Sequence, residues 1–189
     1  MSLKLFRHTD YAQSILSPGE TRFAMHPGWA IVAASLWIGV ACNVWLWHAL
    51  GGADDQLLAA VTVALVVIGA AGFVLSLLGW RRTFKPAATL LLLVAAAAAA
   101  GVFTQGLGLD AVLAGKRPLS LMPAWTSLFG WQVPLLLALL GGAPVIWLWA
   151  QQLRRLDGPS QLATNVSGML LAAALVAGGV VLHAGLPSL

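Results

Sequence analysis

Residues Arg81-Arg82-Thr83-Phe84-Lys85-Pro86 form a short basic stretch between two long apolar runs, Gln56–Trp80 and Ala87–Gly101. An Arg or Lys side chain at the centre of a bilayer costs about 2.5–3.5 kcal/mol on insertion scales. The stretch must therefore lie at a membrane surface, with both neighbouring runs crossing the membrane away from it. Because cytoplasmic loops are enriched in Lys and Arg, we predict that this turn is cytoplasmic. The predicted sidedness of every other loop follows from this assignment.

The composition of the 189-residue chain is that of a polytopic membrane protein. Hydrophobic residues make up 60% and charged residues 8%, whereas a soluble domain carries about 25% charged residues. The ten Lys and Arg residues are scattered over several loops rather than gathered on one face interleaved with aromatics, so we predict no nucleic-acid partner. A single cysteine, Cys42, excludes an intramolecular disulfide.

Five apolar runs are each long enough to cross a hydrocarbon core of about 30 Å. We predict an all-α fold with a five-helix transmembrane domain at residues 27–189, preceded by a cytoplasmic arm at residues 1–26. The predicted spans cover approximately residues 27–50, 56–80, 86–105, 130–152 and 163–186, and an outer loop covers residues 106–129.

Three of the predicted spans carry features that bear on packing. The third contains a run of tiny residues, Ala95–Gly101, which lets neighbouring helices approach closely and predicts a place at the centre of the bundle. The fourth contains Pro134 and Pro144, which predict a kink. The first contains one strongly polar residue, Asn43, which is expected to bond to another helix or to a lipid headgroup.

The distribution of charge supports an N-terminus inside and a C-terminus outside. Eight basic residues lie on the predicted inner side: Lys4, Arg7, Arg22, Arg81, Arg82, Lys85, Arg154 and Arg155. Two, Lys116 and Arg117, lie outside. This bias is typical of a multi-pass protein of the bacterial inner (cytoplasmic) membrane.

The sequence shows no pattern typical of a metal, haem or nucleotide site, and we assign no cofactor. His26 and His48 lie at opposite ends of the first span, about 33 Å apart at the rise of an α-helix. His48 and His183 are both expected near the outer face, so a bis-histidine haem stays open there. No Asp or Glu falls within a predicted span, which argues against a proton relay of the pump type.

Several short motifs resemble those of the lipid A phosphoethanolamine transferases. Phe84-Lys85-Pro86, followed by a Leu/Ala span ending in Phe103-Thr104-Gln105-Gly106-Leu107-Gly108, resembles the third helix of that family. Further similarities are Leu139-Leu140-Gly141-Gly142-Ala143-Pro144, Asn43, and Arg154-Arg155-Leu156 before the last helix. The resemblance covers approximately residues 27–186 and implies a membrane domain of five helices with its C-terminus outside.

The resemblance also implies where the chemistry of the family lies. Its members place a zinc-dependent periplasmic domain of alkaline-phosphatase type, with a threonine nucleophile, after the fifth helix. This chain ends at Leu189, so we expect no catalysis by this chain alone. The family's outer loop also uses an Asn and an acidic residue to hold phosphoethanolamine, whereas Leu109–Trp125 contains no Asn and no Glu.

The outer ends of spans one, three and four are where polar, charged and aromatic side chains are expected to converge. The predicted lipid- or partner-binding residues are Asn43, Trp45, Gln105, Asp110, Lys116, Arg117, Trp125 and Trp131. The two cations there suit a lipid phosphate or an acidic partner loop. We therefore predict a non-catalytic membrane domain that binds a membrane phospholipid or a membrane protein. Two alternatives remain: the membrane half of a divided or truncated transferase acting on lipid A, and an unrelated complex subunit or small transporter.

Overall fold

The computed structural model describes residues 24–51, 54–80, 82–109, 121–154 and 156–185. In this part of the chain the regular elements are helices, apart from one isolated β-bridge between Met25 and Leu153. Four helices are long and apolar enough to cross a membrane, and five if the bent first helix counts as one span. The predicted all-α, multi-spanning fold is therefore confirmed.

Each span is built from one long helix or from two shorter helices joined by a π-helical segment. In chain order they are α1 (Pro27–Leu36), the π-helical segment η2 (Trp37–Ala41) and α2 (Val44–Leu50); α3 (Asp54–Leu77); α4 (Phe84–Gln105); α6 (Gln132–Leu136), the π-helical segment η5 (Leu137–Gly142) and α7 (Ala143–Ala150); and α8 (Gly158–Ala184). A short 3-10 helix, η4 (Trp125–Phe129), precedes α6.

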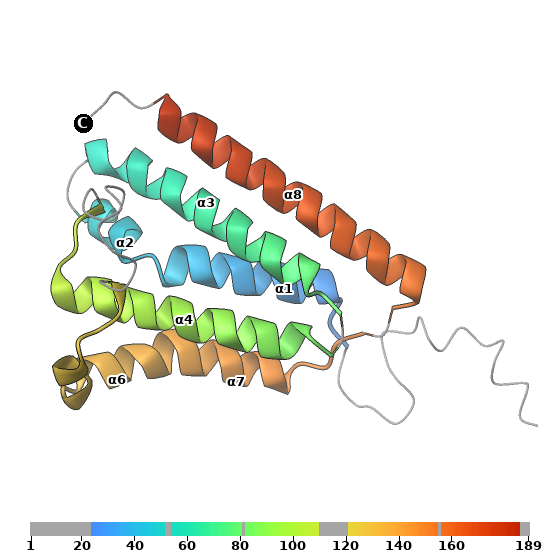
Figure 1. Ribbon diagram of the computed structural model, residues 1–189, viewed down its shortest axis with the longest axis horizontal. Coiled ribbons are helices and arrows are strands. Elements are labelled where there is room, and N and C mark those ends of the chain that lie inside the picture. Colours follow the sequence, from blue (N-terminus) through green and yellow to red (C-terminus); the bar gives the residue numbers. More distant parts are fainter. Residues whose placement is uncertain (1–23, 52–53, 81, 110–120, 155, 186–189) are drawn as a thin grey trace, which may run out of the picture.

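The helices lie side by side in the order α8, α3, α1, α4 and then the α6–α7 span (Figure 1). We call one end of this row the basic end; among the described residues it carries 24–26, 79–80, 82–85, 151–154 and 156–158. The opposite end, which we call the loop end, carries residues 42–51, 104–109 and 121–132 (Figure 1).

The hydrophobic core forms where α1, α3, α4 and α7 meet. Its buried members are Ala30, Ile31, Ala34, Leu75, Phe84, Ala88 and Leu148. The middle of the row is therefore α1. The alanine-rich helix α4, which we expected at the centre, packs between α1 and the α6–α7 span. Its small residues do allow close packing, since Ala88, Ala96 and Ala100 are fully buried.

The sharpest bend lies in the first span, where the sequence predicted a continuous helix. The segments Pro27–Ala41 and Val44–Leu50 meet at an angle of 57°. Asn43 explains the break, because its side-chain Oδ1 accepts a hydrogen bond from Leu46 N at 3.1 Å and caps a new helix. A side chain that satisfies the backbone in this way competes with continuation of the preceding helix.

The fourth span, for which we predicted a kink, runs as one candidate span from Gln132 to Ala150 with a π-helical segment inside it. Pro144 has no N–H and cannot bond to the carbonyl of Leu140, four residues earlier. The indole Nε1 of Trp37 donates to this carbonyl at 2.9 Å. A neighbouring helix thus satisfies the backbone group that the proline releases, as membrane-spanning proline helices require.

The last helix, α8, begins at Gly158 rather than at the predicted Ala163. Asp157 holds an extended conformation at the N-cap, and Pro159 stands in the first helical turn, where its missing N–H is not needed. The predicted span of residues 163–186 leaves these residues in a loop. At a helix start, however, proline is favourable.

Candidate functional site

The structure describes part of the predicted lipid- or partner-binding set. Asp110, Lys116 and Arg117 lie outside the described residues. Trp125 is described only as the first residue of η4. The side chains of Asn43, Trp45, Gln105 and Trp131 are described, and all four residues belong to the loop end.

Asn43 and Trp45 connect the bent first span to the end of α4. The indole Nε1 of Trp45 donates to the carbonyl of Leu107 at 2.8 Å. Leu107 follows Gly106, whose positive φ of 60° ends α4 in the left-handed conformation that glycine adopts most easily. Asn43 is 5% exposed, and its Nδ2 is buried with no hydrogen-bond partner in the structure. A buried amide donor of this kind is a group that a ligand oxygen would satisfy.

Gln105 attaches a later part of the predicted outer loop to α4. Its Nε2 donates to the carbonyl of Met122 at 2.7 Å. One turn earlier, a Cβ on Gly101 would overlap the Leu121 carbonyl oxygen, so only glycine fits beneath this segment. Trp45 and Gln105 thus both use their side-chain N–H groups to hold backbone around the last turn of α4. They form a frame for a site rather than offering these donors to a ligand.

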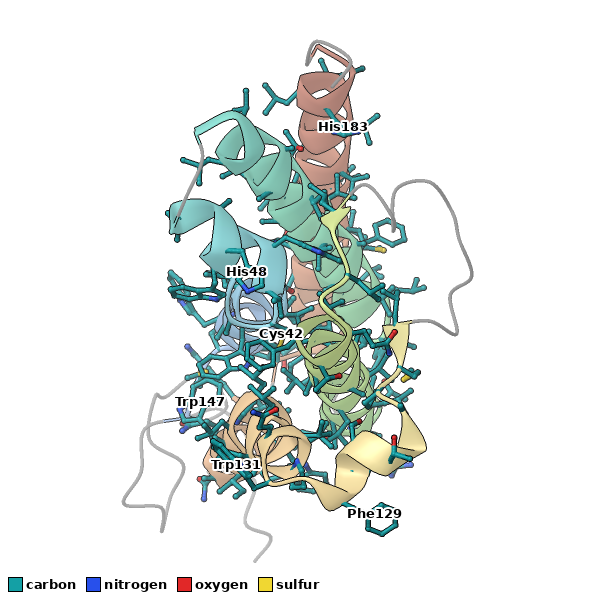
Figure 2. The ribbon with its side chains drawn as sticks, turned by 90° about the vertical axis from the view of Figure 1, so that its left-hand side faces the viewer. Cys42, His48, Phe129, Trp131, Trp147 and His183 are labelled. Carbon is teal, nitrogen blue, oxygen red and sulfur yellow. The ribbon has the colours of Figure 1, made fainter. Side chains whose placement is uncertain are left out.

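Trp131 is separate from this frame. It precedes α6 and is 74% exposed, and Phe129 beside it is 93% exposed. In Figure 2, where the loop end faces the viewer, Phe129 points away from the bundle, whereas Cys42 lies inside it. Exposed aromatic rings at the end of a span are typical of anchors at the membrane–water interface.

Metal and haem ligation find little support in the described part of the chain. It contains no group of three or more His, Cys, Asp or Glu side chains that could hold a metal ion. His48 belongs to α2 and His183 to the last turn of α8, as Figure 2 shows, and both helices pack on α3.

Lys85 has a structural role that the sequence did not reveal. Its Nζ donates to the carbonyl of Gln151 at 2.9 Å and of Trp149 at 3.4 Å, and lies 5.4 Å from the centroid of the Trp149 ring. A cation at a helix C-terminus satisfies its last carbonyls and interacts favourably with the helix dipole. Trp149 in turn donates its indole N–H to Thr89 Oγ1 at 3.0 Å. The basic turn therefore joins α4 to α7.

A buried polar cluster at the basic end was also missed. Gln161 Nε2 donates to the carbonyl of Gly79 at 2.8 Å and to Asn165 Oδ1 at 2.9 Å, and both side chains are buried. Their spacing of four residues on α8 places them on one helix face. That spacing was visible in the sequence, but the partner carbonyl belongs to a residue distant in the chain.

Comparison with known proteins identifies the family. No curated protein and no solved structure was found to match the chain. The family model described as phosphoethanolamine transferase EptA/EptB matches residues 67–185. The match contains most of the motifs that suggested the resemblance, although Asn43 precedes it. The chain therefore belongs to the phosphoethanolamine transferase EptA/EptB family and carries the N-terminal membrane domain of that family.

Proposed function

We propose that this domain binds the headgroup of a membrane phospholipid at the loop end and does not itself transfer phosphoethanolamine. The family match over residues 67–185 carries the proposal, because it names a family that handles a phospholipid headgroup. The motif resemblance assigns the transfer chemistry to a separate zinc-dependent domain. The membrane domain is then left with binding and positioning the lipid.

The geometry of the loop end supports this assignment. Trp45 and Gln105 fix the backbone around the last turn of α4, which gives a rigid frame. Asn43, two residues before Trp45, is buried and has an amide donor with no partner in the structure. By sequence, Lys116 and Arg117 belong to the predicted outer loop between α4 and η4, and their positive charge would suit a lipid phosphate. Exposed Phe129 and Trp131 suit the depth of lipid headgroups.

The proposal includes the orientation of the chain in the bacterial inner membrane. The excess of Lys and Arg at the basic end favours a cytoplasmic basic end and an outward loop end. A reporter that is active only outside the cytoplasm should be silent when fused at Lys85 or Asp157. It should be active at Asp55, Gly115 and Leu189. Activity at Lys85 would reverse the arrangement and place the proposed headgroup site on the wrong leaflet.

Substitution of Asn43 tests the headgroup site directly. Asn43→Ser keeps a side-chain oxygen that caps α2 but removes the amide donor. We expect the variant to melt close to the parent and to retain at least about tenfold less phosphatidylethanolamine in native mass spectrometry, since bonds to charged groups are the stronger ones. Equal lipid retention by the variant and the parent would contradict the site.

The two outer cations provide a second test with a matched control. The double variant Lys116→Ala/Arg117→Ala should lose co-purified phospholipid. The control Arg81→Ala/Arg82→Ala removes the same charge from the basic end and should retain it. If both doubles keep every lipid and protein that co-purifies with the parent, the outer charges take no part in binding.

A second candidate function follows from the name of the family itself. In this alternative the domain is the membrane half of a transferase whose catalytic domain acts on lipid A. Vesicles that contain the 189-residue chain, phosphatidylethanolamine and lipid A should then show transfer only when a soluble catalytic domain of the family is added. Transfer by the chain alone would overturn the non-catalytic proposal. The family match argues against the third alternative, an unrelated complex subunit or small transporter, only in that the chain is not unrelated to the family.

A further inference from the structure

A groove of about 450 Å³ runs along the surface between α1 and α8. It exists because α8 packs closely on α3 and touches α1 little. The floor is made of small residues: Gly72, Ser76, Gly168 and Ala172. The walls include Leu36 of α1 and Leu171 of α8, which are 46% and 69% exposed. The groove therefore opens sideways, toward the membrane interior.

The lining changes from polar to apolar along the groove. His26 and Thr164 line it at the basic end, and Leu36, Ile68 and Leu175 line it farther into the membrane. The basic end is also where α1 begins and α3 ends, so the polar lining lies where the spans meet the membrane surface. A phospholipid changes from polar to apolar in the same direction, with its headgroup and ester groups at the membrane surface and its acyl chains inside.

Ser76 gives the groove an unused polar group. It is 0% exposed, and its Oγ lies against Gly168 with no hydrogen-bond partner in the structure. A rotation of its side chain about χ1 is needed to offer the hydroxyl to a ligand in the groove. By contrast, the nearby Ser35 donates its hydroxyl to the carbonyl of Ile31 at 2.8 Å. Ser76 precedes the last residue of α3, Leu77, and so lies at the depth of phospholipid ester carbonyls. A carbonyl oxygen is the acceptor that this hydroxyl lacks.

The size of the groove distinguishes between occupants. A ten-residue helix, about 15 Å long and at least 10 Å across, fills roughly 1,200 Å³, so a helix from a second copy would leave most of its volume outside the groove. An extended peptide would place backbone N–H and C=O groups against a lipid-facing wall, where they find no partners. A single acyl chain has neither problem, because it is narrow and lacks hydrogen-bonding groups.

We propose that the groove holds one acyl chain of a phospholipid, with the ester carbonyl of that chain accepting a hydrogen bond from Ser76. His26 stands at the headgroup end. Its Nδ1 accepts from Gly28 N at 3.1 Å, so its Nε2–H is the donor that faces a phosphate or glycerol oxygen. This lipid is distinct from the headgroup site proposed at the loop end, because it occupies different helices at the opposite end of the bundle.

Two adjacent leucines provide a matched test. Leu171 lines the groove, whereas Leu170 does not, and the two are almost equally exposed at 69% and 67%. The chain is reconstituted in nanodiscs of phosphatidylethanolamine and phosphatidylglycerol and released for native mass spectrometry. We expect the parent and Leu170→Trp to retain two phospholipids, one at each proposed site. We expect Leu171→Trp to keep the Asn43-dependent lipid and to lose the groove lipid by at least tenfold. Equal retention by both tryptophan variants would overturn the proposal.

Ser76→Ala tests the hydrogen bond separately from the space. It should weaken lipid retention about fivefold, as expected for one neutral hydrogen bond, and should leave the melting temperature at or above that of the parent.

In vesicles, phosphatidylethanolamine with a photoactivatable acyl chain should label Ile68, Leu171 and Leu175 more than Leu170. Crosslinks from these positions to residues 1–23 or to a second copy, without lipid adducts, would identify a different occupant. Loss of the Asn43-dependent lipid alone would leave this site intact, so the two proposals fail independently.

Discussion

The interface between α3 and α8 and the interface between α4 and the α6–α7 span hold helices together in different ways. In the first, the two backbones touch: a Cβ on Gly69 would lie 2.7 Å from the Ala172 carbonyl oxygen and 2.9 Å from Val176 N. In the second, side chains reach across. A Cβ on Gly141 would meet only side-chain atoms of Ala96 and Leu93 at close range, both at 3.2 Å.

The difference shows two ways in which helices associate in a membrane, where lipid is as apolar as the side chains and the hydrophobic effect does not drive helices together. Close approach through glycine gains dispersion contacts but tolerates no added atom. The second interface instead contains side chains that donate to exposed carbonyls, such as Lys85 to Gln151 and Trp149. Because such bonds are individually modest, the second interface should lose stability in smaller steps when single residues are changed.

The largest effect is expected for Gly69→Ala. The new methyl group would overlap the α8 backbone, which cannot move away as a side chain can, and we expect a loss of about 3 kcal/mol in unfolding free energy. Gly178→Ala is the control, since a Cβ there meets nothing within 4 Å. It should gain up to about 1 kcal/mol from helix propensity. Thermal melting in detergent measures both, and shifts of the same sign would contradict the backbone contact.

Ala96→Leu tests the second interface by overpacking. Ala96 is 0% exposed and faces Gly141, so the added atoms must displace α4 from η5, at a cost of about 2 kcal/mol. Ala97→Leu, on the adjacent and partly exposed position, should lose less than about 0.5 kcal/mol. If Ala96→Leu melts with the parent, the alanine face of α4 does not pack as described.

Lys85→Met should cost about 1–1.5 kcal/mol, because the last carbonyls of α7 lose a charged donor while the apolar stem is kept. Arg82→Met removes an equal charge from an exposed position in the same turn and should leave the melting temperature unchanged. Guanidinium denaturation, or thermal melting at low salt, compares the stabilities of the Lys85→Met and Arg82→Met variants. Equal losses would mean that net charge, not the contact with α7, sets the effect.

The smallest effect is expected for Trp37→Phe, which removes the donor to the Leu140 carbonyl. Hydrogen bonds between membrane helices average about 0.6 kcal/mol. Trp29→Phe is the control, because Trp29 is 68% exposed and the structure gives its indole no hydrogen bond. A Trp37→Phe variant that is as stable as the Trp29→Phe variant would show that the released carbonyl finds another partner.

The hydrophobic runs predicted the fold class because long uncharged segments have one solution in a bilayer, the helix. The break at Asn43 could not be predicted in the same way. Whether an Asn side chain caps a new helix or faces a neighbouring one depends on a balance of local hydrogen bonds. The partner of the carbonyl that Pro144 releases could not be predicted either, since Trp37, which bonds to Leu140 O, comes from a distant part of the chain.

The candidate site was predicted only in part, and the reasons are also physical. The sequence placed Trp45 and Gln105 at one end of the bundle, where the structure also has both, but their partners are the backbone carbonyls of Leu107 and Met122. A carbonyl has no sequence signature. From the sequence, Lys85 served only to place its turn at the cytoplasmic surface, because the insertion energy of a charged side chain depends on its depth in the membrane. Its bond to Gln151 depends on the position of α7, which no local pattern encodes.

The bent first span has a consequence for the shape of the membrane itself. The ten residues of α1 and the five of η2 rise at most about 22 Å before the 57° bend, which is less than a hydrocarbon core of about 30 Å. Beyond the bend, α2 covers the remaining depth only obliquely. A span that falls short of the core thins the adjacent leaflet at a modest cost per ångström. Headgroups beside α2 would then be drawn toward the midplane, and thus toward the buried amide of Asn43.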